Sequence, residues 1–169
     1  MANAQSFGVL MAIAMLSTSA LAAQSDDAAA HARATRDMIA KWAGNYDTDA
    51  FLRQPAVHTE LQKLLGSELE HLMHNLNVRG AVDLSGQTLS VNGNAPHQGT
   101  EEEAIVCVTP GSMTVEAAIL SKDTVRVFTR AEKYDSASLC IKDWITLANS
   151  RHADRFAQPA NVTMVEPAR

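Results

Sequence analysis

Residues 82–128 read VDLSGQTLSVNGNAPHQGTEEEAIVCVTPGSMTVEAAILSKDTVRVF, a series of short apolar or alternating segments separated by turn residues. Such segments are typical of β-strands that bury one or both faces. We expect strands at 88–92, 104–108, 114–120 and 124–128, and a short strand at 82–84 that forms a hairpin with the first of them. Successive strands joined by short turns pair in antiparallel fashion. The segment therefore predicts an antiparallel sheet of about five strands.

Helical patterns lie on both sides of this segment. Before it, the alanine-rich residues 27–43 predict a helix that ends at Gly44. Residues 45–49 can cap a short helical segment at 50–53. Apolar residues at steps of three and four from Val57 to Leu76 then predict one long helix that begins at Pro55. After the strands, residues 139–147 predict a final short helix. Helices, then strands, then a helix indicate an α+β fold with helices packed on an antiparallel sheet.

The first 23 residues are typical of a secretory signal peptide. The apolar run FGVLMAIAML at 7–16 is followed by small residues with an A-x-A pattern at Ala20-Leu21-Ala22. The run is shorter than the ~20 apolar residues that a membrane span needs. No Lys or Arg precedes Arg33, so an N-terminal amphipathic helix or a misassigned start codon is the alternative.

The expected organisation is a signal peptide at 1–23, an N-terminal helix at 24–46, an α+β domain at 47–150 and a polar, loosely attached tail at 151–169. A cleaved signal peptide would place the mature protein in the periplasm or outside the cell. No later segment is apolar enough to span a bilayer.

Composition narrows the class of partner. The 169 residues contain 14 Lys+Arg and 19 Asp+Glu, giving a net charge of -5, and no three basic residues are consecutive. Proteins that neutralise phosphate backbones carry basic patches instead. We therefore expect no nucleic-acid partner.

Residue patterns typical of catalysis are missing from the sequence, which has no G-x-S-x-G motif and no glycine-rich phosphate loop. We expect neither an enzyme nor a cofactor. His71 and His74 stand three residues apart on the long predicted helix, but no HExxH or CxxC motif supplies further metal ligands. A solvated helix face with a Glu70 to His74 pair is favoured over a metal site.

Three adjacent carboxylates, Glu101 to Glu103, precede the strand at 104–108. They could bind a cation or a basic partner, but alternate side chains of a strand point to opposite faces, so the three cannot converge on one ion unaided. A solvated strand entry is the favoured interpretation.

The two cysteines, Cys107 and Cys140, are best considered together. Cys107 lies within a predicted strand and Cys140 lies four residues before Trp144 on the last predicted helix. Both could face the layer between the sheet and that helix. A disulfide is favoured in an oxidising compartment, and two buried free thiols are the alternative.

The loop at 93–99, GNAPHQG, is the most unusual local feature. Pro96 fixes its own φ angle, and the glycines at both ends allow sharp turns, so the loop can project His97 from a rigid sheet. The alternative is an ordinary surface turn that contains a histidine.

Several strings of residues, in the same order, resemble the Ivy family, the bacterial inhibitors of vertebrate lysozyme. They are YDTDAFL at 46–52 with PAV at 55–57, LLG at 64–66, NLNV at 75–78, EAIV at 103–106, AAIL at 117–120, VRVF at 125–128 and the closing segment from Leu139 to Ile145. NAPHQG at 94–99 resembles the C-x-P-H-x-C loop of that family. The likeness extends roughly from Asp47 to Ala148.

This resemblance implies an Ivy-like fold and a function. The loop histidine of the family enters the lysozyme cleft and bonds the two catalytic carboxylates, so His97 would be the key contact, Pro96 the stiffener and Gln98 a neighbouring contact. Asn94 and Gly99 occupy the places of the family's loop cysteines. The implied partner is lysozyme or another peptidoglycan-degrading enzyme, and the family's tendency to dimerise implies that a homodimer can form.

The alternative is a binding protein of the same fold with another target in the cell envelope, such as a competitor's wall-degrading effector, and without lysozyme inhibition. A small envelope protein with a structural or metal-buffering role is a third hypothesis.

Overall fold

A computed structural model describes residues 14–151 and 161–167. The chain divides into two units, Met1–Asp37 and Met38–Arg169, and each is considered by itself. In the first unit the described residues belong to helix α1 (Ala14–Trp42), whose last residues belong to the second unit. The helix begins at Ala14, before residue 24 where the sequence predicts the start of the N-terminal helix. Residues 1–13 of the predicted signal peptide lie outside the described part of the chain.

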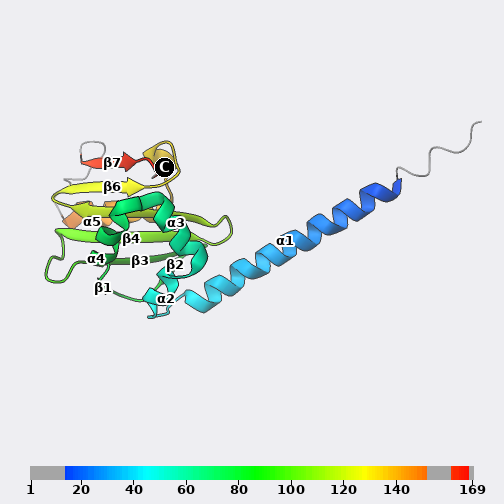
Figure 1. Ribbon diagram of the computed structural model, residues 1–169, viewed down its shortest axis with the longest axis horizontal. Helices are drawn as coiled ribbons and strands as arrows, with labels where there is room; N and C mark the ends of the chain where they lie inside the picture. The colour runs from blue at the N-terminus through cyan, green and yellow to red at the C-terminus, as the bar shows by residue number, and fades with distance from the viewer. Residues whose placement is uncertain (1–13, 152–160, 168–169) are drawn as a thin grey trace, which may run out of the picture. The chain divides into compact units, whose positions relative to one another are not determined.

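The second unit is built on a seven-stranded sheet of order β1-β3-β4-β5-β6-β7, with β2 also paired to β3 (Figure 1). The strands are β1 (Val78–Arg79), β2 (Asp83–Ser85), β3 (Thr88–Asn94), β4 (Glu102–Thr109), β5 (Thr114–Ser121), β6 (Thr124–Phe128) and β7 (Val162–Val165). Strands β2 to β6 pair antiparallel in sequence order. This confirms the predicted α+β class and the predicted run of antiparallel strands.

Strand β7 was not predicted. The sequence places Val162–Val165 in a polar tail, but in the structure this segment pairs in parallel with β6, with Val125 opposite Val162 and Phe128 opposite Val165. Val162 and Met164 pack on the buried residues of one face of the sheet, and Val165 packs on those of the other. Residues 152–160 and 168–169 of the predicted tail lie outside the described residues.

The long helix predicted from Pro55 to Leu76 is interrupted. It consists of α3 (Pro55–Leu65), a 3₁₀ turn at Gly66–Glu68 and α4 (Leu69–His74). Gly66 has φ 53°, a left-handed conformation that ends α3 and that glycine adopts without steric cost. The apolar periodicity correctly identifies the buried face of both helices, but it does not reveal the break.

Helices cover both faces of the sheet (Figure 1). The short helix α2 (Thr48–Leu52), α3 and α4 lie on one face, and α5 (Leu139–Arg151) lies on the other. Each interface is a cluster of buried apolar side chains, with members such as Leu61, Leu64, Val91, Val106 and Ile119 on the first face and Ile105, Leu120, Val127, Ile141 and Trp144 on the second. Because its central strands are covered on both faces, the sheet is a rigid support for the loops at its ends.

Among the described residues, no helix combines the length and the apolar character needed to cross a membrane.

Candidate functional site

The connection between β3 and β4, residues 95–101, is called the His97 loop from here on. It leaves the sheet where Asn94 of β3 pairs with Glu103 of β4. Ala95 is buried, whereas residues 96–101 are all exposed. The loop therefore presents its tip, with Pro96, His97 and Gln98, to solvent.

Backbone hydrogen bonds give this loop a defined shape. Ala95 N–H donates to Glu102 O at 2.9 Å and Gln98 N–H donates to Ala95 O at 3.1 Å. Gln98 O in turn accepts from the N–H groups of Glu101 at 3.1 Å and Glu102 at 3.0 Å. The backbone of His97 has φ 62°, which is uncommon for a residue with a side chain. The loop is thus two successive tight turns with His97 in the first.

Asn94 and Gly99 are neighbours at the base of the loop. A Cβ atom at Gly99 would lie 3.8 Å from both Cγ and Nδ2 of Asn94, which is ordinary van der Waals contact. The Asn94 amide instead donates to Ala95 O at 2.8 Å. Both cysteines of the sequence form the Cys107–Cys140 disulfide, so no disulfide crosses this loop.

Glu102 and Glu103, at the first positions of β4, are not a solvated strand entry as the sequence suggests. The carboxylate of Glu103 accepts from the Thr100 N–H at 3.0 Å and pairs with Arg151 of α5 at 2.5 Å, and the residue is only 8% exposed. Glu102 is half-buried and turns toward α4 and β5. Only Glu101 matches the expected solvated character.

The carboxylate of Glu102 accepts three hydrogen bonds. His71 Nε2 lies 2.9 Å from Oε2, Asn75 Nδ2 donates to the same oxygen at 3.0 Å, and Ser121 Oγ donates to Oε1 at 2.6 Å. Burial by itself raises the pKa of Glu102, but the bonds from Ser121, His71 and Asn75 outweigh it and leave the pKa below its usual value. The carboxylate is therefore held ionised at the base of the His97 loop.

His71 is placed differently from the sequence-based expectation. Glu70 and His74 are exposed, as the sequence predicts, whereas His71 is half-buried, pairs with Glu102 and has its Nδ1 atom 3.5 Å from Glu68 Oε2. Arg126 of β6 donates to Glu68 at 2.8 Å, and this bond lowers the pKa of Glu68. In residues 14–151 and 161–167, no three or more His, Cys, Asp or Glu side chains are grouped so that they could hold a metal ion.

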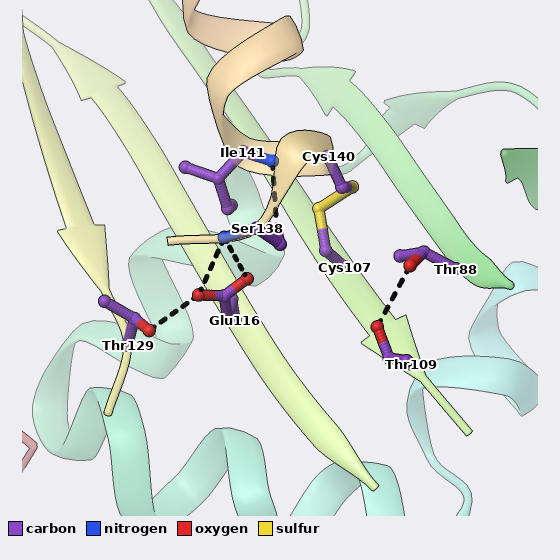
Figure 2. The surroundings of a disulfide bond; sticks show 8 residues. All are labelled: Thr88, Cys107, Thr109, Glu116, Thr129, Ser138, Cys140 and Ile141. Carbon is purple, nitrogen blue, oxygen red and sulfur yellow. Dashed lines mark hydrogen bonds between the residues drawn. A yellow bond between two sulfur atoms is a disulfide. The ribbon is translucent and has the colours of Figure 1, made fainter. Parts of the chain in front are cut away.

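The predicted cysteine pair is a disulfide between β4 and α5 (Figure 2). Cys107 lies in the cluster of buried residues between the sheet and α5. On the neighbouring strand β5, the buried carboxylate of Glu116 accepts hydrogen bonds from Thr129 Oγ1 at 2.7 Å and from the Ser138 N–H at 3.1 Å. The start of α5 is thus bound to two adjacent strands.

Sequence reasoning singled out the residues of the loop tip but missed those that support it. Glu102 was noted only as one of three adjacent carboxylates, and Asn75, Ser121 and Glu116 gave no motif. The one local signal is the position of Asn75 beside Leu76, near the end of an apolar helix pattern. In the structure Asn75 is fully buried although its side chain is polar.

A comparison with protein families finds one that matches. The model of the family Ivy, described as inhibitor of vertebrate lysozyme, matches residues 56–150, more than half of the 169-residue chain. The match includes α3, α4, the strands β1 to β6 and the His97 loop. No curated protein and no solved structure matches the chain. The extent of the family match, together with helices packed on a largely antiparallel sheet, shows that this chain belongs to the Ivy family of vertebrate lysozyme inhibitors.

Proposed function

We propose that this chain inhibits lysozyme by inserting the His97 loop into the active-site cleft of the enzyme. The observation that carries the proposal is the exposed, hydrogen-bonded loop with His97 near its tip. Membership of the Ivy family supports lysozyme inhibition in general, and it supports a binding role rather than catalysis.

The chemistry of an imidazole suits this target. Glycosidases of this kind use two carboxyl groups that flank the scissile bond. A protonated histidine carries two N–H donors on opposite sides of a small flat ring, so one ring between two carboxyl groups can occupy both. Pro96 limits the backbone freedom of the tip, and Gln98 adds an amide beside the histidine.

The charge of the chain also suits this target. A net charge of -5 attracts a cationic lysozyme and raises the rate of encounter. The Cys107–Cys140 disulfide is typical of proteins in an oxidising compartment. Together with the signal-like residues 1–23, it supports a location in the periplasm or outside the cell.

The test is inhibition of a vertebrate lysozyme by the purified protein, followed as clearing of a cell-wall suspension. Wild type should inhibit and His97→Ala should lose most of the inhibition. His58→Ala is the matched control, because His58 lies on α3 and contributes neither to the loop nor to its hydrogen bonds. If His97→Ala and His58→Ala both inhibit as well as wild type, the loop mechanism is wrong. Sedimentation of the free protein would show whether it forms a homodimer.

A second candidate function rests on Asn94 and Gly99. Since no disulfide crosses the base of the loop, the loop can be adapted to a different wall-degrading enzyme, for example a competitor's effector. This candidate predicts that the protein does not inhibit vertebrate lysozyme, and that His97→Ala weakens its binding to that other enzyme.

A further inference from the structure

Glu102 is the residue at which the His97 loop joins the scaffold. Its backbone closes the loop on both sides, because its carbonyl accepts from Ala95 and its N–H donates to Gln98 O. Glu102 no longer pairs with β3, whose last partner on β4 is Glu103, but it still pairs with Ser121 of β5. The main chain of Glu102 is therefore hydrogen-bonded to the loop as well as paired with β5.

The side chain of Glu102 points the other way, into the scaffold. Its carboxylate is bound by His71 of α4, by Asn75 at the end of α4 and by Ser121 of β5. Asn75 is fully buried, and its Nδ2 group also lies 3.4 Å from the carbonyl oxygens of Glu103 and Leu120, while its Oδ1 atom has no partner among the residues that the structure describes. The orientation of the Asn75 amide is therefore set by the oxygens that its NH₂ group faces, among them the Glu102 carboxylate.

The neighbours of His71 also orient its ring toward Glu102. Its Nδ1 atom lies 3.3 Å from a terminal nitrogen of Arg126. Nδ1 also lies 3.5 Å from Glu68 Oε2. Because an ionised carboxylate only accepts hydrogen bonds, the 2.9 Å contact with Glu102 places a proton on Nε2, whichever of the two neighbours Nδ1 faces. Glu68, which binds Arg126, holds that guanidinium in place. The chain of contacts from Glu68 through Arg126 and His71 thus ends on the Glu102 carboxylate.

We propose that Glu102, bound by His71, Asn75 and Ser121, is a positioning residue that holds the His97 loop in its binding conformation before the partner arrives. The effect on binding rests on the proposed function. The order of the loop does not, because it is a property of the free protein. A loop without a disulfide must otherwise be ordered on binding, at a cost of affinity. The Glu102 cluster removes that cost non-covalently.

The experiment compares Glu102→Ala and the milder Glu102→Gln with Glu101→Ala, a change at the exposed neighbouring carboxylate. The first readout is amide hydrogen exchange of residues 98, 101 and 102 in the free protein, which needs no lysozyme. Glu102→Ala should speed exchange of these amides by about ten-fold or more, with Glu102→Gln intermediate and Glu101→Ala unchanged. Unchanged exchange in Glu102→Ala would overturn the proposal, whether or not the protein inhibits lysozyme.

The second readout is the dissociation constant for vertebrate lysozyme. Glu102→Ala should raise it by about ten-fold, and the added pair Asn94→Cys with Gly99→Cys should restore it, because a disulfide between these neighbouring positions orders the loop without the cluster. If the bridge forms but affinity is not restored, Glu102 does not act through loop order and the proposal fails. If wild type does not bind lysozyme at all, the proposed function fails, while the exchange result still decides the role of Glu102.

Discussion

Cys107 and Glu116 lie directly opposite each other on β4 and β5, and both bind the start of α5. Cys107 does so through its disulfide with Cys140, and Glu116 does so through the N–H group of Ser138 (Figure 2). Ser138 also caps the helix, since its hydroxyl accepts from the Ile141 N–H at 3.3 Å. One cross-strand pair therefore fixes where the helix on this face of the sheet begins.

Removing the disulfide should destabilise the fold. The disulfide joins two residues that are 33 positions apart and so restricts the unfolded chain. Replacing Cys107 and Cys140 together by Ala removes this restriction, so the free energy of unfolding should fall by about 2–4 kcal/mol. Urea denaturation at neutral pH measures this difference. An unchanged midpoint would mean that the bridge adds no stability to the contacts around it.

Glu116→Gln should be costly although it preserves shape. Glu116 is only 4% exposed, and both of its oxygens face donors, so a Gln NH₂ group would leave a buried donor unpaired, at about 1–3 kcal/mol. The exposed Glu132→Gln is the control and should be neutral. Because Glu116 and Cys107 act on the same helix start, combining Glu116→Gln with loss of the disulfide should give a non-additive result in urea denaturation.

Gly93→Ala should disturb the strand that leads into the His97 loop. A Cβ atom at Gly93 would lie 2.5 Å from Val78 O and 2.9 Å from Arg79 Cβ, so β1 would have to move, at about 1–3 kcal/mol. Gly80→Ala is the matched control, because no described residue other than its two chain neighbours has an atom within 4 Å of the added Cβ. Thermal denaturation of the two variants should separate them clearly, and equal melting temperatures would contradict the close approach of β1.

The sequence predicts those parts of the fold that depend on local pattern. The strands from β2 to β6 follow from alternation and turn residues, and the buried face of α3 and α4 follows from leucine spacing. The break at Gly66 was missed because a glycine is compatible with both a continuous and an interrupted helix. Strand β7 was missed because its pairing with β6 joins segments far apart in the chain.

The same limit applies to the candidate site. Pro96 and His97 were singled out because proline and the flanking glycines restrict or permit particular backbone conformations, a property that is visible in the local sequence. The burial of Glu102, Glu103 and Glu116 could not, because their partners His71, Arg151 and Ser138 lie 31, 48 and 22 residues away along the chain. A charged residue in a sequence gives no sign of a distant partner, so solvation was the natural expectation.

Acid should weaken the contribution of Glu102 to stability. Despite burial, hydrogen bonds from Ser121, His71 and Asn75 hold its folded-state pKa below the ordinary value of 4.5. A depressed carboxyl pKa contributes stability that is fully present above the unfolded pKa and is lost as pH falls through the folded pKa. Wild type should therefore have a higher melting temperature than Glu102→Gln at neutral pH, and the difference should narrow as the pH falls below 4.5. The pKa of Glu68 is lowered in the same way by Arg126, but both proteins keep this contact, so its sensitivity to acid is common to the two. A gap that is constant with pH would rule out the ionised form of Glu102 as the source of its stabilisation.

Salt should slow the association of this protein with lysozyme more than it speeds dissociation. The attraction between a chain of net charge -5 and a cationic enzyme acts over distances near the Debye length, which is about 10 Å at 0.1 M salt and about 3 Å at 1 M. In the proposed complex, the contacts of His97 in the cleft would be short and shielded from solvent, so their rate of breaking should depend weakly on salt. Surface plasmon resonance over this range should thus show a falling association rate and a nearly constant dissociation rate. His97→Ala should show the reverse pattern at fixed salt, with association close to wild type and faster dissociation, because it removes a short-range contact and leaves all 14 Lys and Arg and all 19 Asp and Glu residues in place. An association rate that is independent of salt would mean that the acidic charge plays no part in recognition.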